Sequence, residues 1–178
     1  MKYNPEKHHR RSIRLQGYDY SLPGAYFITI CTEKRICLFG NIIYGKMVLN
    51  EYGKIAQQCW LNIPLHYQNV ELNEFVVMPN HIHGIIIIND TVGAIHELPQ
   101  QKTPQQRRLM TLPKIIGRFK MNSAKQLNQL RQTSGLSVWQ RNYYEHIIRN
   151  EFEFNKIREY IINNPLKWEL DKHHSNNN

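Results

Sequence analysis

The chain has few cysteines, few acidic residues and no long apolar run, and each shortage excludes a class of protein. Cys31, Cys37 and Cys59 show no C-x-x-C spacing, which argues against a disulfide framework and against a structural zinc site. The longest apolar runs, FVVM and IIII, have the length of strands and are too short to span a membrane. The first residues are basic and polar and do not resemble a secretory signal. We therefore expect a cytoplasmic protein with reduced thiols and no membrane partner.

Acidic side chains are outnumbered: 14 Asp and Glu stand against 23 Lys and Arg, for a formal net charge of +9. A basic surface on a small domain favours a polyanionic partner, most often nucleic acid. A solvated basic face is the alternative for any single cluster. The candidate nucleic-acid-binding residues are the basic side chains of the N-terminal arm and of a central helix, with two residues near position 140: Arg10, Arg11, Arg14, Lys114, Arg118, Lys120, Trp139 and Arg141.

A chain of 178 residues is long enough for one domain with a sizeable core. We expect a basic arm over 1–22, a single domain over 23–168 that contains a mobile loop over 89–110, and a polar tail over 169–178. Hydrophobic periodicity and turn residues predict the secondary structure. Strands are expected at 25–32, 70–78, 82–88 and 143–148, helices at 50–61, 111–130 and 151–163, and a hairpin-like excursion before Leu49.

The expected order of these elements is β-α-β-β-α-β-α. That order predicts an α+β fold, a ferredoxin-like split β-α-β antiparallel sheet with helices on one face and one additional C-terminal helix. Asn150 is expected to cap that last helix, with Glu153 as its partner in a capping box.

The segment FVVMPNHIHGIIII, residues 75–88, contains two histidines in an otherwise apolar strand. Residues two apart in a strand project from the same face. His81 and His83 therefore point the same way, while Ile82 faces the opposite layer. Two imidazoles on one face of a buried strand are candidate metal ligands; two buried structural histidines are the alternative.

A second motif lies in the last predicted helix, FNKIREYIINNP. Tyr160 and Asn164 are four residues apart, so they lie one turn from each other on one helix face. A core tyrosine and a simple helix C-cap are the ordinary interpretation. Together they also match a nucleophile and an amide-oxygen ligand that could complete a coordination shell begun by the histidines.

The combination of YFITICT, MPNHIHGII and WQRNYYEHIIR followed by YIINNP resembles the single-tyrosine HUH transposases, and among them most the REP-associated tyrosine transposases. The resemblance spans about residues 17–168. It implies that His81 and His83 bind Mg²⁺ or Mn²⁺ and that Tyr160 attacks a phosphodiester of single-stranded DNA. Asn164 lies where mobile-element relatives usually carry a glutamine as third ligand, and it is a shorter amide at the same spacing.

The resemblance further implies a 5′-phosphotyrosine intermediate, with strand transfer that needs no ATP because the covalent link conserves the phosphodiester energy. The expected substrates are hairpin-forming, palindromic repeats, bound by a monomer or a homodimer. The second hypothesis is a domesticated transposase without catalysis that only recognises DNA hairpins.

Other residues leave alternatives open. A metal hydrolase with His146 as third ligand is a further candidate function, although a satisfied strand histidine is the favoured role of His146. Trp139 and Tyr144 could stack on bases or belong to the core. Tyr143 and Tyr144 are rival nucleophiles on chemistry alone, but both fall in the expected strand and lack the Y-x-x-x-N spacing.

Overall fold

The computed structural model describes residues 18–90 and 111–170. Arg10, Arg11 and Arg14 of the predicted arm, nearly all of the loop expected over 89–110, and most of the tail lie outside the described residues. Two tyrosines at the end of the predicted arm belong to the folded body: the ring of Tyr18 contacts those of Tyr20 and Tyr26, and Tyr20 is buried in the main core.

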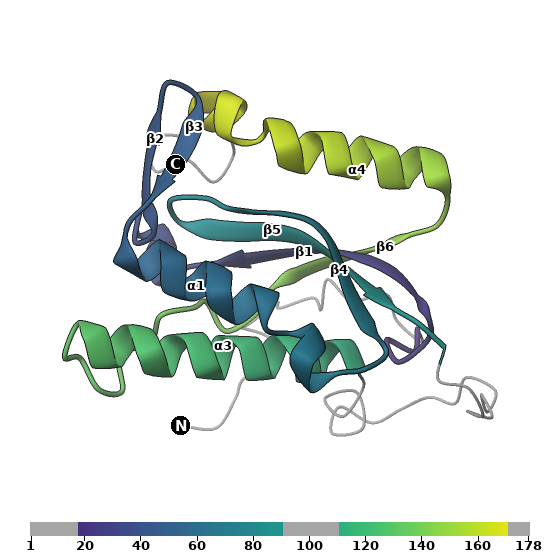
Figure 1. Cartoon of the computed structure of the whole chain (residues 1–178), viewed down its shortest axis with the longest axis horizontal. Coiled ribbons are helices and arrows are strands. Elements are labelled where there is room, and N and C mark those ends of the chain that lie inside the picture. Colours follow the sequence, from purple (N-terminus) through teal and green to yellow (C-terminus); the bar gives the residue numbers. More distant parts are fainter. Residues whose placement is uncertain (1–17, 91–110, 171–178) are drawn as a thin grey trace, which may run out of the picture.

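Four strands form one sheet with the order β4-β5-β1-β6, and all neighbouring pairs are antiparallel. In chain order they are β1 (Gly24–Cys31), β4 (Val70–Val77), β5 (His81–Ile88) and β6 (Tyr144–Ile148). The runs AYFITI and IIII supply the β-branched and aromatic side chains that pack well on a pleated surface. β5 lies between β4 and β1, which the chain joins through a helix (Figure 1).

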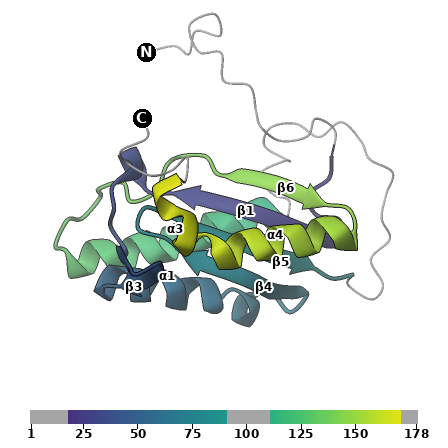
Figure 2. The same cartoon turned by 90° about the horizontal axis from the view of Figure 1, so that it is seen from above.

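Three α-helices of the described chain cover the two faces of this sheet. α1 (Glu51–Leu61) and α3 (Thr111–Leu130) lie side by side on one face, and α4 (Glu151–Asn163) crosses the other (Figures 1 and 2). A hairpin of β2 (Gly40–Ile43) and β3 (Lys46–Leu49) stands at one end, and short 3₁₀ turns η1 (Glu33–Arg35), η2 (Pro64–His66) and η3 (Pro165–Leu170) complete the described structure. The fold is thus α+β with a four-stranded antiparallel sheet.

The secondary structure predicted from the sequence is confirmed, with shifts of one residue at several ends. The hairpin-like excursion is the β2–β3 pair, and the last predicted strand begins at Tyr144 rather than Tyr143. α4 begins as expected, because the Asn150 side chain accepts a hydrogen bond from the Glu153 N–H at 2.8 Å. The Glu153 carboxylate accepts from the Arg149 N–H at 2.8 Å and pairs with His146. These two hydrogen bonds, chiefly the one from Arg149, lower the pKa of Glu153.

The alternation of β5 divides its side chains between two cores. Ile82 and Ile86 belong to the main core beneath α1 and α3, whereas Ile85 belongs to a smaller core beneath α4. The smaller core is completed by Phe27, Ile148 and Ile161. The pleat therefore directs the odd-numbered residues of β5 toward α4.

Gly84 allows α1 to approach β5 closely. A Cβ atom at this position would lie 2.5 Å from Cζ2 of Trp60 and 3.0 Å from Cβ of Phe75. Trp60 is fully buried, so its indole covers the strand at the position directly after His83. A glycine is needed here for space and not for an unusual backbone angle.

No helix within residues 18–90 and 111–170 combines the length and the apolar character that a membrane crossing requires.

We predict that Gly84→Ala destabilises the protein by about 1–3 kcal/mol, because the added methyl group forces Trp60 out of its position. The free energy of unfolding in urea measures this effect. Gly117→Ala is the matched control: its Cβ would meet nothing within 4 Å, and alanine is the better helix former, by up to about 1 kcal/mol. Equal stability of Gly84→Ala and wild type would contradict the packing described for Trp60.

Candidate active site

His81 and His83 lie together on the α4 face of the sheet, as their spacing predicts. Their ring centroids are 4.4 Å apart, with an angle of 68° between the ring planes. The exposed fraction is 0% for His81 and 1% for His83. Both side chains therefore have their positions fixed by the surrounding protein, and Ile82 between them lies in the opposite core as expected.

The neighbouring Asn80 determines which nitrogen of His81 carries hydrogen. The amide Nδ2 of Asn80 donates to the backbone carbonyl of Arg35 at 3.2 Å, so its Oδ1 is the atom 2.8 Å from Nδ1 of His81. An amide oxygen can only accept, so Nδ1 of His81 must donate. In the neutral ring, Nε2 then carries a lone pair, which is the arrangement that a metal ligand needs.

His83 has a hydroxyl group at each ring nitrogen. The Thr29 hydroxyl lies 2.8 Å from Nδ1, and the Tyr160 hydroxyl lies 3.2 Å from Nε2. Thr29 reaches the ring because β1 pairs with β5 so that Thr29 stands directly opposite His83. Since hydroxyl groups both donate and accept, the pair of contacts is compatible with either neutral form of the ring. Phe27 stacks on the same ring with centroids 5.3 Å apart.

Tyr160 projects from α4 toward the histidine pair. Its ring meets His83 at 5.2 Å and Phe27 edge-to-face at 6.0 Å, and 39% of the residue is exposed. The site therefore opens to solvent at the tyrosine. Tyr144 also packs against Phe27, at 6.2 Å, whereas the Tyr143 ring lies 5.4 Å from the Lys120 ammonium group.

Asn164 and Trp168 border the site on the C-terminal side of α4. Asn164 is 2% exposed and follows the last residue of the helix, one turn after Tyr160. Trp168 in η3 is 9% exposed, and its ring lies 6.0 Å from that of His81. The buried amide of Asn164 is thus on the same side of the sheet as the histidine pair, and its role as a third ligand stays a prediction.

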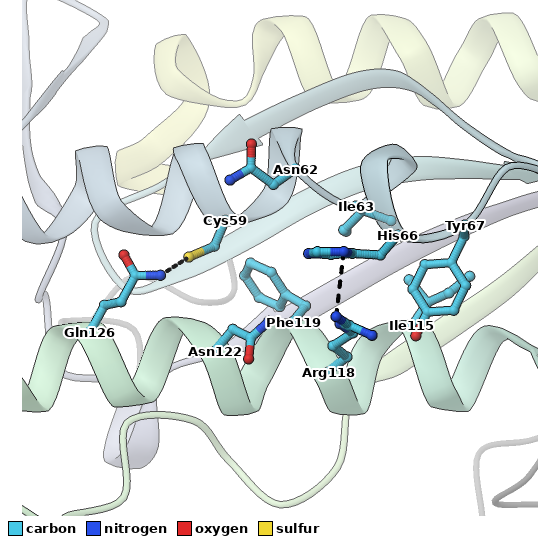
Figure 3. A pocket seen from close by; sticks show the side chains of 10 residues that line it. All are labelled: Cys59, Asn62, Ile63, His66, Tyr67, Ile115, Arg118, Phe119, Asn122 and Gln126. Atoms are coloured by element: carbon cyan, nitrogen blue, oxygen red, sulfur yellow. Dashed lines mark hydrogen bonds between the residues drawn. The ribbon is translucent and has the colours of Figure 1, made fainter.

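The predicted DNA-binding side chains of α3 lie on the other face of the sheet. Lys114 and Arg118 are exposed there, and Arg118 borders a pocket between α1 and α3, where its Nη2 lies 3.4 Å from Nδ1 of His66 (Figure 3). Lys120 instead donates to the backbone carbonyls of Gln140 and Asn142, at 3.0 and 2.9 Å. Its amine holds α3 to the segment that precedes β6.

Two sequence-based alternatives are settled by burial and pairing. Trp139 is 5% exposed, and its indole N–H donates to the Ser123 hydroxyl at 2.9 Å. The prediction that Trp139 stacks on DNA is therefore wrong in this structure, and the core alternative holds; Arg141 nearby is exposed. Nε2 of His146 lies 2.6 Å from Oε1 of Glu153, which favours the role of a satisfied strand histidine.

Sequence reasoning missed the residues that orient the histidines. Asn80 directly precedes β5 and Thr29 lies within β1, and the sequence pattern singles out neither of them. Asn80 is 0% exposed and Thr29 is 4% exposed. Only the pairing of β1 with β5 could have pointed to Thr29, and nothing in the sequence indicates that Asn80 contacts Arg35.

The chain is similar in sequence to two proteins of Haemophilus influenzae. It is 49% identical over 176 residues to an uncharacterized protein of Haemophilus influenzae, covering 96% of each chain. It is 29% identical over 151 residues to a candidate REP-associated tyrosine transposase of the same organism, covering 84% of this chain and 74% of that one. At this identity the chain is a distant homologue of that candidate transposase.

The solved structure of a REP-associated tyrosine transposase bound to a REP hairpin shares the fold. It superposes with a TM-score of 0.51 at 18% identity, covering 87% of this chain and 74% of that chain. No protein-family model matches the chain. The transposase-like fold thus accompanies sequences that have diverged far from one another.

We predict that in the metal-free protein Nδ1 of His81 carries hydrogen and Nε2 does not. Long-range ¹⁵N–¹H NMR spectra of the histidine rings, recorded with a chelator present, report the two nitrogens separately. Asn80→Ala should abolish this preference, because it removes the amide oxygen that lies at Nδ1, while Asn69→Ala, at a half-buried asparagine directly before β4, should not change it. A wild-type ring with hydrogen on Nε2 alone would contradict the assigned role of Asn80.

Proposed function

We propose that this protein cleaves single-stranded DNA at hairpin-forming, REP-like sequences and transfers the strand through a 5′-phosphotyrosine at Tyr160, with a divalent metal ion at His81 and His83. The observation that carries this proposal is the contact of the Tyr160 hydroxyl with Nε2 of His83, at 3.2 Å. The Tyr160 phenol contacts a buried histidine and is also partly exposed to solvent, so a substrate phosphate could reach it. This is the arrangement that a tyrosine nucleophile needs.

The order of the strands supports a ferredoxin-like scaffold for this chemistry. β1, α1 and β4 form a β-α-β unit that β5 splits, and β6 lies on the other side of β1. In this arrangement the helices of the two β-α-β units share one face, which leaves the other face of the sheet to α4 and the histidines.

The residues at the site match the donors that a divalent ion needs. The expected set is one nitrogen from each of His81 and His83 and the amide oxygen of Asn164, which leaves positions for phosphate oxygens and water. Within residues 18–90 and 111–170 there is no group of three or more His, Cys, Asp or Glu able to hold an ion. Among these described residues, the candidate third ligand is therefore the amide oxygen of Asn164, and the ion that we propose for this set is Mg²⁺ or Mn²⁺.

The reaction exchanges one phosphodiester for another. The Tyr160 oxygen forms a bond to phosphorus, the bond from phosphorus to the 3′ oxygen breaks, and that oxygen leaves as a hydroxyl after taking up a proton. A free tyrosine has a pKa near 10, so the phenol must lose its proton as it attacks. A bound divalent ion supplies charge neutralisation at the phosphate. Because an ion bound at Nε2 of His83 would take the place of the Tyr160 hydroxyl at that nitrogen, we infer that the observed hydrogen bond belongs to the metal-free state.

A hairpin-binding protein without catalysis is the second candidate, and α3 is the observation that favours it. This helix carries Lys114, Arg118, Lys120 and Lys125 and no acidic residue over its 20 residues. Its exposed cations lie on the face opposite Tyr160, so that they could hold a DNA hairpin through its phosphates whether or not cleavage follows. A hydrolase that depends on His146 is not favoured, since that ring pairs with Glu153.

We predict that wild-type protein forms a covalent adduct with a labelled single-stranded hairpin DNA in Mn²⁺ or Mg²⁺, seen as a shifted band on a denaturing gel. Tyr160→Phe should abolish the band completely, because no other oxygen takes the place of the phenol, and a chelator should abolish it in wild type. Tyr144→Phe is the matched control: it removes a phenol against the same Phe27 ring and should retain the adduct.

Two outcomes of this experiment would replace the proposal. Cleavage that persists in Tyr160→Phe without any adduct would indicate hydrolysis by water. Tight, salt-sensitive hairpin binding without cleavage in any metal would favour the binding-only function.

A further inference from the structure

We propose that the exposed edge of α4 is a binding track for the single strand that flanks the cleaved bond, with a base stacked on Phe152 and a phosphate held by Lys156. This inference rests on the proposed function and assigns the path of its substrate. It concerns a surface on the side of the sheet that carries Tyr160, not the basic helix α3.

The track is a stripe of side chains at helical spacing. Phe152, Lys156 and Tyr160 follow each other at intervals of four residues, so they lie on one side of α4, about 6 Å apart along its axis. Phe152 is 74% exposed and Tyr160 is 39% exposed. The helix packs through other residues, Phe154, Ile157 and Ile161, which leaves the stripe facing away from the core.

Neighbouring contacts show which edge of α4 carries the stripe. Glu153 meets His146 of β6, whereas Arg158 on the other side of the helix lies 3.4 Å from Glu74 of β4. By the helical period, Lys156 and Tyr160 are on the Glu153 side of α4. Tyr144, at the start of β6, is 41% exposed, and both Tyr144 and Tyr160 contact the Phe27 ring. A further exposed aromatic side chain therefore lies near Tyr160.

The chemistry of this stripe matches a single-stranded nucleic acid. Exposed aromatic rings interleaved with cations are the elements that bind single strands, because any base can stack and any phosphate can pair. Lys156 Nζ lies 5.2 Å from the centroid of the Phe152 ring, which places a positive charge next to the stacking surface. The carboxylate of Glu153 is held by His146 and by the Arg149 N–H. Glu151 and Glu159 are exposed carboxylates on the same helix, and Lys156 and Arg149 are the exposed cations that would hold phosphate beside Phe152.

An exposed phenylalanine could instead be covered by a protein segment or by a second copy of this chain. The positive charge beside Phe152 and its place on the same helix side as the nucleophile favour DNA over both. The proposal therefore places a base two helical turns from the attacked phosphate, on whichever flank of the DNA passes over α4.

The experiment scans 2-aminopurine, a fluorescent base, through the positions on both sides of the cleavage point. It uses full-length protein carrying Tyr160→Phe, so that the substrate stays intact. Stacking on Phe152 should quench the fluorescence at one or two adjacent positions. Adding Phe152→Leu should remove this quenching and weaken binding about tenfold, whereas Phe152→Trp should retain both, because Trp keeps an aromatic face and Leu keeps only apolar character.

Two further variants separate the contributions. Lys156→Gln should lower the slope of log Kd against log salt concentration by about one, as the loss of one phosphate contact predicts. Leu65→Ala is the control, since Leu65 is a 78% exposed apolar residue in η2, at the end of α1, and it should change neither quenching nor affinity.

The possible results distinguish this inference from the proposed function. Quenching that depends on Phe152 supports the track even if wild-type protein forms no covalent adduct. Adduct formation with no position quenched through Phe152 overturns the track and leaves the tyrosine mechanism standing. A shift to a larger species in sedimentation that Phe152→Leu abolishes, without any effect on DNA, would overturn it in favour of a contact between two copies.

Discussion

The pleat of β5 is the constraint on which the rest of this structure depends. One short strand must supply the main core and the candidate site at the same time, and it does so by alternation: Ile82 and Ile86 enter the core beneath α1, and His81 and His83 face α4. Gly84 lets Trp60 seal the core side directly behind the histidines. A shift of one residue in the pairing of β5 with β1 would exchange the two faces, burying imidazoles in the main core and exposing isoleucines to the site. Stability and function therefore require the same register.

Asn80 and Thr29 contact the Nδ1 atoms of the two histidines, and Tyr160 contacts the opposite nitrogen of His83. Asn80 and Thr29 each meet an Nδ1 atom at 2.8 Å, and both are nearly inaccessible to water. On the other side of the His83 ring, α4 brings the Tyr160 hydroxyl to 3.2 Å from Nε2. Such outer contacts set ring orientation and ligand basicity at histidine sites. The strand pair β1–β5 thus orients the histidines, whereas α4 carries Tyr160, the proposed nucleophile.

Local patterns were enough to predict most of the fold and the centre of the site. The i, i+2 spacing of the histidines, the i, i+4 spacing of Tyr160 and Asn164, and the capping of α4 by Asn150 depend on residues close in sequence, so simple periodicity finds them. Sequence periodicity does not predict contacts between residues that are far apart in the chain. The orientation of the Asn80 amide depends on a carbonyl 45 residues earlier, and Trp139 is aromatic whether it stacks on DNA or packs against Phe119. Composition alone also does not show that the basic side chains of α3 lie on the face of the sheet opposite to α4 and Tyr160.

The central claim is that Tyr160, and no other residue, becomes linked to DNA, and peptide mapping tests it most directly. Wild-type protein would be incubated with a cleavable hairpin substrate and Mn²⁺, the adduct digested with protease and nuclease, and the nucleotide-bearing peptide sequenced by mass spectrometry. The account predicts a single modified peptide with a phosphotyrosine at Tyr160, carrying the nucleotide through its 5′ phosphate. A modification on Tyr144, a linkage through a 3′ phosphate, or modification spread over several residues would contradict it.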